Sequence, residues 1–372
     1  MSTSNEKRSS TTNAALHDLK PLTLVHPLLN SIPPELFPRF DPVYVDHYNR
    51  YNVGRLHTHQ VPIEEMRANP SKYVITYGRA TGPDIYRITE QTVLVKGGEI
   101  TVRIFEPAPK LDGEGKQKNR GAYLNFHGGG WVFGDHEFGH DYLKRMVHDL
   151  DGEVVAIDVN YRHAPENRYP TAIEDSWAAL NWVRSKSKEL SIDPDRLAVG
   201  GMSAGGHLSA VLAHLCRDNG FPLRLQVLTV PVVDMHSSFT LDGKFDRANT
   251  PYESYREMEF TPALPAARME YFHRHWLGTP RPESSGEDWK ISPIFAPNFA
   301  NLASALVFTA ELDVLRDEGE AYAEKLKAAG VEVEVIRVLG VAHSFSQLDD
   351  ILDGAKMFDK KSIGAIGKAL SA

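Results

Sequence analysis

Ser203 has the clearest capacity for chemistry in this sequence, because glycines flank it at Gly201 and Gly205. A short apolar run over 197–199 precedes it, and an amphipathic run over 203–217 follows it. This order predicts a sharp turn from a strand into a helix, with the serine hydroxyl at the turn and room for neighbouring backbone beside the glycines. A hydroxyl needs a base to become a nucleophile, so this segment alone establishes no reaction.

A second glycine-rich segment, His127–Trp131, follows an apolar run over 122–126. Three adjacent glycines leave their backbone N–H groups open to a ligand, since no side chain covers them. We expect the amides of Gly128 and Gly129, with that of Ala204 at the start of the helix after Ser203, to hold a developing oxyanion.

The base and the acid that orients it are predicted later in the chain. Asp313 follows an apolar run over 305–310, and His343 follows another over 331–338. Nucleophile, acid and base in this order, each just after a strand, predict a catalytic triad with Ser203.

Asp317 and Glu318 are alternative acids near Asp313. Both stand at the start of a predicted helix, where the helix dipole favours carboxylates without any catalytic role. Asp313 is therefore the predicted acid.

The elements that must position these residues alternate between strand and helix. A hairpin is expected over 91–105, and from residue 122 onward short β-branched runs alternate with amphipathic ones. Strands are predicted over 122–126, 154–159, 197–199, 225–230, 305–310 and 331–338, and helices over 172–188, 203–217, 318–329 and from about 352. The alternation predicts an α/β fold with a mostly parallel, doubly wound sheet and helices on both faces.

Two segments depart from this rhythm. Residues 21–80 contain prolines and no strand alternation, which is typical of short helices and turns. Residues 234–301, with a helical stretch over 264–276, predict an insertion over the active edge of the sheet. Residues 1–20 are polar and predict a disordered tail.

Composition excludes several classes of function. A formal net charge of -8 and short Lys/Arg runs predict no nucleic-acid partner. No run of eighteen apolar residues and no secretory signal is present, so we expect no stable membrane insertion and a cytoplasmic location. The single cysteine, Cys216, is predicted to be a packed thiol, and His207 and His214 on the same predicted helix are assigned no role.

Taken together, these segments resemble the hormone-sensitive-lipase-like esterases and the arylacetamide-deacetylase-like carboxylesterases. The matching segments run in the family's order and are 127–131, 161–166, 201–206, 313–319 and His343 with Phe345. The resemblance implies an α/β-hydrolase fold, hydrolysis of a small-molecule carboxylic ester by the triad, and no metal or other cofactor.

The resemblance also implies how the chain is divided. A helical cap would be formed by residues 21–85 and 234–301, and the catalytic core by residues 86–233 and 302–372. Association into a homodimer stays open.

Three residues are expected to border the substrate pocket. Family members usually carry an acidic residue before the nucleophile and a glycine after the histidine, where this chain has Met202 and Ser344. Trp131 is a further candidate for the wall of the acyl pocket, with core packing as the alternative.

Three competing interpretations use other features. The segment His136–His140 reads H-E-x-x-H, which on a helix would bind zinc, although Gly139 and the lack of a third ligand argue against it. A ligand-binding protein on this scaffold is a second interpretation, and the presence of His343 argues against that one. The segment 127–131 also resembles that of kynurenine formamidases, so amide cleavage by the same triad is the third.

Overall fold

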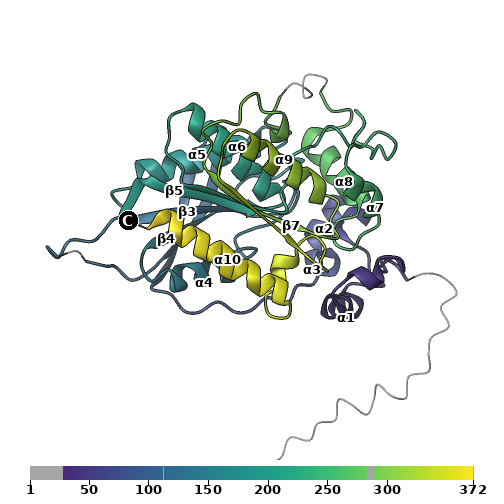
Figure 1. Cartoon of the computed structure of the whole chain (residues 1–372), viewed down its shortest axis with the longest axis horizontal. Helices are drawn as coiled ribbons and strands as arrows, with labels where there is room; N and C mark the ends of the chain where they lie inside the picture. Colours follow the sequence, from purple (N-terminus) through teal and green to yellow (C-terminus); the bar gives the residue numbers. More distant parts are fainter. Residues whose placement is uncertain (1–27, 112, 283–285, 287, 372) are drawn as a thin grey trace, which may run out of the picture.

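An eight-stranded sheet runs through the part of the chain that the computed structural model describes, residues 28–111, 113–282, 286 and 288–371 (Figure 1). The strands are β1 (Arg87–Val95), β2 (Gly98–Glu106), β3 (Arg120–Phe126), β4 (Val154–Asn160), β5 (Ile192–Met202), β6 (Leu225–Thr229), β7 (Ser304–Ala310) and β8 (Val333–Val338). Their order in the sheet is β1-β2-β4-β3-β5-β6-β7-β8. The hairpin β1–β2 and the pair β2–β4 are antiparallel, and the remaining pairs are parallel. The predicted tail over 1–20 lies outside the described residues.

Helices cover both faces of the sheet, as the alternation predicts. Figure 1 shows α4 (His140–Asp149) and α10 (Asp353–Leu370) on one face, and α5 (Thr171–Ser185), α6 (Ala204–Asp218) and α9 (Arg316–Ala328) on the other. The central strand β3 is buried along its whole length, as expected for a strand covered on both sides. The predicted α/β-hydrolase fold is confirmed.

Two elements differ most from the sequence prediction. Helix α4 was not predicted, although Leu143, Met146 and Val147 form a buried stripe at helical spacing. Strand β5 begins at Ile192, earlier than the expected 197. Its residues 193–196 are three charged residues and a proline, which give no strand pattern.

The short helices gather at one end of the sheet (Figure 1). From the N-terminal segment come α1 (Pro42–Tyr51), α2 (Ile63–Ala68) and α3 (Pro70–Tyr73), and from the segment between β6 and β7 come α7 (Glu253–Glu257) and α8 (Ala266–Leu277). Short 3-10 helices lie at Phe37–Arg39, Thr58–Gln60, Pro293–Phe295 and Phe345–Gln347. Within the described residues, no helix is both long enough and apolar enough to cross a bilayer.

The register of the parallel strands fixes which loops meet at that end. Phe126 at the end of β3 pairs with Gly201 near the end of β5, and Ala310 at the end of β7 pairs with Val338 at the end of β8. The glycine segment after β3 therefore lies beside the serine turn after β5. In the same way, the loops that carry Asp313 and His343 leave neighbouring strands at the same edge.

Candidate active site

Ser203 lies at the turn between β5 and α6, as predicted. Its backbone has φ 58° and ψ -116°, a conformation that costs a non-glycine residue energy and that the surrounding turn must hold. The Ser203 amide donates to the Thr229 carbonyl oxygen at 2.9 Å, and its own carbonyl accepts from the His207 amide at 3.0 Å. Within the described residues Ser203 Oγ makes no hydrogen bond, including none to His343.

The glycine at 205 is required by a close approach of backbone. A Cβ added at Gly205 would lie 1.8 Å from the carbonyl oxygen of Phe126, far inside van der Waals contact. The turn after β5 is thus packed against the end of β3, and any side chain at this position would push the two apart. The sequence predicts that a glycine here leaves room for neighbouring backbone, and the structure places the Phe126 carbonyl in that space.

Asp313 and His343 form a buried pair beyond β7 and β8. The His343 Nδ1 donates to the Asp313 Oδ2 at 2.7 Å, and the Asp313 Oδ1 accepts from the Leu315 amide at 3.1 Å. Asp313 is fully buried and His343 is 6% exposed. Because the carboxylate only accepts, it holds the hydrogen on Nδ1 and leaves Nε2 as the basic nitrogen.

The two alternative acids are occupied elsewhere. The Asp317 carboxylate accepts from the Ser254 amide at 2.7 Å and pairs with Arg316. The Glu318 carboxylate accepts from the Val233 amide at 2.8 Å, and burial holds the pKa of Glu318 well above its usual range. Both residues stand in the first turn of α9, and neither forms a hydrogen bond with His343.

The backbone amides predicted to bind the oxyanion have no hydrogen-bond acceptor within the described residues. Within the described chain, the backbone N–H groups of Gly128, Gly129 and Ala204 donate to no backbone or side-chain acceptor. Gly129 has φ 116°, and a Cβ there would lie 1.9 Å from the Phe133 carbonyl oxygen. The loop is held from behind by His127, whose Nδ1 donates to the Gly128 carbonyl oxygen at 2.8 Å.

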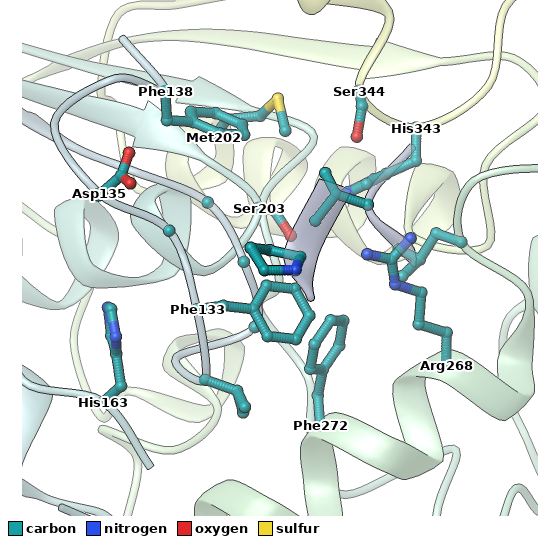
Figure 2. A pocket seen from close by; sticks show the side chains of 18 of the residues that line it. Phe133, Asp135, Phe138, His163, Met202, Ser203, Arg268, Phe272, His343 and Ser344 are labelled. Atoms are coloured by element: carbon teal, nitrogen blue, oxygen red, sulfur yellow. The ribbon is translucent and has the colours of Figure 1, made fainter. Parts of the chain in front are cut away.

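Gly128, Gly129, Ser203 and His343 line one cavity of about 360 Å³. Figure 2 shows Ser203, His343, Met202 and Ser344 around it, with Phe133 and Phe272 on the opposite wall. The N-terminal segment contributes Met66, Arg67, Pro70, Val74, Tyr77 and Arg79, and the insertion contributes Leu264, Arg268 and Phe272. The wall is largely apolar, as in most small-molecule sites.

Two of the three predicted pocket residues reach the cavity and one does not. Met202 and Ser344 line it, and the Met202 Sδ accepts from the Ser346 Oγ at 3.3 Å. Trp131 is 1% exposed, and its ring stacks on that of Trp276 with centroids 3.8 Å apart. The pocket role predicted for Trp131 is therefore corrected to core packing, the alternative reading of that residue.

The H-E-x-x-H segment does not form a zinc site. Residues 136–139 form a turn and helix α4 begins only at His140, so the two imidazoles do not share a helix face. His136 donates from Nδ1 to the Asp158 carboxylate at 2.8 Å and its Nε2 bonds Thr101 at 3.0 Å. Glu137 pairs with Arg103, and the described residues contain no group of three potential metal ligands.

The residues that were assigned no chemistry are packed, as expected. Burial raises the pKa of the Cys216 thiol to about 12. His207 Nε2 donates to the Lys290 carbonyl oxygen at 2.8 Å, and burial lowers the pKa of His207 to about 4. Burial likewise lowers the pKa of His214 to about 4, and its Nε2 lies 3.1 Å from the Tyr322 hydroxyl.

Several residues that line the cavity were not predicted from the sequence, among them His163 and Arg268. His163 lines the cavity although the segment around it was assigned no chemistry, and burial lowers its pKa to about 3. Arg268 lines it from α8 and is only 8% exposed. The available signal for Arg268 was a charged residue one helical turn before Phe272, within an otherwise apolar stripe.

A sheet of this order, with a serine at the turn after β5 and a histidine after β8, defines the class of α/β-hydrolases. A family model described as alpha/beta hydrolase fold matches residues 123–347. The chain belongs to this family, in its hormone-sensitive-lipase-like branch.

Several named relatives support the same class. An AB hydrolase superfamily protein of Schizosaccharomyces pombe is 34% identical over 340 residues, which are 88% of this chain and 93% of that protein. The carboxylesterase NlhH of Mycobacterium tuberculosis is 35% identical over 292 residues, which are 77% of this chain and 84% of that one. The crystal structure of EstE1, a thermophilic carboxylesterase from a metagenomic library, superposes with a TM-score of 0.69 at 36% identity, covering 79% of this chain and 92% of that chain. The predicted enzyme class, a carboxylesterase-type hydrolase, is confirmed.

Proposed function

We propose that this chain hydrolyses carboxylic esters of small to medium size through an acyl-enzyme on Ser203. The observation that carries the proposal is the 2.7 Å hydrogen bond between Asp313 and His343, formed beside the cavity that Ser203 lines. The amides without acceptors at Gly128, Gly129 and Ala204 support it, since a reaction through an oxyanion needs such donors.

In the first step, His343 Nε2 takes the proton of the Ser203 hydroxyl as Oγ bonds to the ester carbonyl carbon. The carbonyl π electrons move to oxygen, and the three amides stabilise that charge. Asp313 stays ionised and stabilises the imidazolium that has formed. The tetrahedral intermediate collapses by breaking the bond to the alcohol oxygen, which leaves with the proton from His343.

In the second step, His343 takes a proton from water as the water oxygen attacks the acyl carbon. The bond between the acyl carbon and Ser203 Oγ breaks, and His343 returns the proton to Oγ. The products are one carboxylic acid and one alcohol, and the enzyme is regenerated.

Substitution Ser203→Ala tests the proposal directly. We expect kcat for 4-nitrophenyl acetate to fall by about four to six powers of ten, with the thermal unfolding curve unchanged. A serine-directed phosphonate should label the parent chain at Ser203 and leave the variant unlabelled. Activity of the variant near that of the parent would refute the assignment of the nucleophile.

Amide cleavage by the same residues is the alternative within this mechanism. Matched 4-nitrophenyl acetate and 4-nitroacetanilide have the same acyl group and a similar leaving group, so their ratio of kcat/KM isolates the bond type. We expect the ester to be preferred, because relatives named for their activity are ester hydrolases.

The cap and the location complete the proposal. Residues 21–85 and 234–301 would act as the cap over the active site, since described residues of both segments line the cavity together with Ser203 and His343. The protein would act on its ester substrate in the cytoplasm, in keeping with its single cysteine, which has no partner for a disulfide within the chain.

A further inference from the structure

Arg268 is a buried cation in the wall of the substrate cavity. It stands on α8, is 8% exposed, and lines the same cavity as Ser203 and His343. In Figure 2 its guanidinium points from α8 toward the side of the cavity that holds His343. A charge in this position loses most of its contact with bulk water, which is costly unless another group compensates.

The protein satisfies little of this guanidinium. Nη1 donates to the Ala263 carbonyl oxygen at 2.7 Å, whereas the Nε has no hydrogen-bond partner. The guanidinium also lies 5.9 Å from the Phe133 ring centroid and 5.7 Å from that of Phe272. Within the described chain, no carboxylate forms an ion pair with it. A guanidinium carries five N–H donors in a planar fork, and only one of them has a hydrogen-bond acceptor within the described residues.

The titratable groups nearest Arg268 do not supply a counter-charge. Burial raises the pKa of the Tyr48 phenol well above its usual range and that of Tyr271 to about 12, so both stay protonated near neutral pH. Burial, reinforced by the Arg268 charge itself, lowers the pKa of His57 to about 4 and that of His59 to about 3. Among the described residues, the two acidic side chains that line the cavity, Asp135 and Glu137, come from the loop after β3, and Figure 2 shows Asp135 across the cavity from Arg268.

The other two arginines of the cavity differ from Arg268, since Arg67 is ion-paired and Arg79 is partly exposed to solvent. Arg67 forms an ion pair with Glu166 and donates to the Ala164 carbonyl oxygen at 2.9 Å. Arg79 is only half-buried and donates to the Glu137 carbonyl oxygen at 2.6 Å. Neither leaves a desolvated charge facing the cavity, and this sets Arg268 apart.

We infer that Arg268 binds a carboxylate group of the substrate, so that the enzyme prefers esters that also carry a free carboxylate. The inference rests on the proposed function, because it names the substrate class of the same site. A planar carboxylate matches the open fork of the guanidinium and replaces the missing counter-charge, while Phe133 and Phe272 contact the apolar part of the molecule. The free carboxylate can belong to the acyl part, as in a half-ester of a dicarboxylic acid, or to the alcohol part.

Two matched substrate pairs separate these two sources. For the acyl part, mono-4-nitrophenyl adipate is compared with its terminal amide, and for the alcohol part 4-acetoxybenzoate is compared with 4-acetoxybenzamide. Any intrinsic difference in reactivity within a pair is the same for every enzyme variant, so a change in the acid-to-amide ratio of kcat/KM between variants reports recognition of the carboxylate. We expect the parent enzyme to favour the acid in at least one pair.

The variant Arg268→Gln should lower that ratio by about 10- to 100-fold, the loss expected for a charge-assisted contact. Arg274→Gln is the matched control, because it removes the same charge from the exposed face of the same helix. A general loss of stability or of catalytic geometry affects both members of a pair and cancels in the ratio. An unchanged ratio in both pairs, or an equal drop in the Arg274→Gln enzyme, would overturn the inference.

A measurement on the parent chain covers the case in which Arg268→Gln does not fold. Competitive inhibition by 4-hydroxybenzoate and adipic acid is compared with inhibition by their amides, and tighter binding of an acid supports the inference. Equal inhibition by acid and amide in both pairs would overturn it. If Ser203→Ala retained full activity toward 4-nitrophenyl acetate, the proposed function itself would be wrong, whereas Ser203-dependent hydrolysis with no acid preference would refute only the role of Arg268.

Discussion

Replacing Asp313 by asparagine tests the buried acid most sharply. The two side chains have nearly the same shape, so the change alters charge and hydrogen-bond polarity at a fully buried position with little change in packing. In the native site, one oxygen accepts from His343 Nδ1 at 2.7 Å and the other from the Leu315 amide at 3.1 Å. An asparagine can offer only one oxygen to these two donors.

The Leu315 contact determines which way the asparagine turns. With its oxygen toward the Leu315 amide, its NH₂ group faces His343 Nδ1, which must then accept and carry no hydrogen. The hydrogen moves to Nε2, and Nε2 can no longer take the Ser203 proton. The opposite orientation restores the useful tautomer but leaves two N–H donors facing each other at Leu315, at a cost of about 1–3 kcal/mol.

Loss of the carboxylate charge adds to this effect, since nothing then stabilises the imidazolium formed during reaction. We therefore expect Asp313→Asn to lower kcat for 4-nitrophenyl acetate by about three to four powers of ten, with KM nearly unchanged. Stopped-flow or long-time-course hydrolysis with active-site titration measures the residual rate. Thermal unfolding of the same sample checks that the fold is retained.

Asp317→Asn is the matched control, because Asp317 is the neighbouring acid that bonds the Ser254 amide and not the histidine. It should keep kcat within a few-fold of the parent value, with at most a modest loss of stability. The reasoning would be refuted if Asp313→Asn kept more than about a tenth of the parent kcat, or if Asp317→Asn lost activity to the same extent.

Three further predictions concern backbone contact, acid sensitivity and packing. Gly205→Ala forces a Cβ to within 1.8 Å of a carbonyl oxygen, so we expect the variant to lose more than about 3 kcal/mol of unfolding free energy together with its activity. Gly364→Ala, at an exposed position of α10 with open space at its Cβ, should be neutral or stabilising. Denaturant titration compares the two variants. His207 has a pKa of about 4 in the fold and about 6.5 when unfolded, so the stability that it contributes is complete above about pH 6.5 and is lost as pH falls toward 4. Denaturant titrations at pH 7 and pH 5 measure how much unfolding free energy each protein loses between the two pH values. The loss should be about 2 kcal/mol smaller for His207→Gln than for the parent chain, and identical losses in both proteins would contradict this. Trp131→Leu should cost about 2–4 kcal/mol of unfolding free energy because its ring is packed in the core, and a large rise in KM with unchanged stability would instead restore its pocket role.

The positions of the candidate catalytic residues could be predicted because each is tied to the end of a parallel strand. Parallel strands deliver their following loops to one edge, so a serine turn after β5 and loops after β7 and β8 must meet once the sheet forms. The apolar runs that mark these strands are visible in the sequence, and so is the order in which Ser203, Asp313 and His343 follow them. No side-chain detail beyond residue type was needed.

Trp131 shows where this reasoning fails. Its position just after three glycines suggested a pocket wall, but Gly129, Gly130 and Trp131 all have positive φ, which turns the indole away from the cavity. The ring then stacks on Trp276, which belongs to a different part of the chain. Neither the backbone turn nor the distant partner leaves a periodic pattern in the sequence, so a residue next to a functional loop cannot be assigned to the site by adjacency alone.

Arg268 shows the opposite failure, because it lines the cavity and was not predicted from the sequence. The physical cause is again that its position depends on tertiary packing. The walls of the cavity above Ser203 come from α8 and from short helices of the N-terminal segment, whose placement depends on tertiary packing and not on strand register. Sequence periodicity does mark α8 as a helix with a buried stripe that includes Met269, Phe272 and Trp276, and an arginine inside that stripe must be paired, solvated or aimed at a ligand. Only the structure decides among the three, because only it shows that no carboxylate pairs with this guanidinium and that the guanidinium borders the cavity. The candidate catalytic residues thus stand at the ends of strands, where the sequence pattern predicts them. The residues that contact the substrate stand in the cavity wall, where they can change without disturbing those strands.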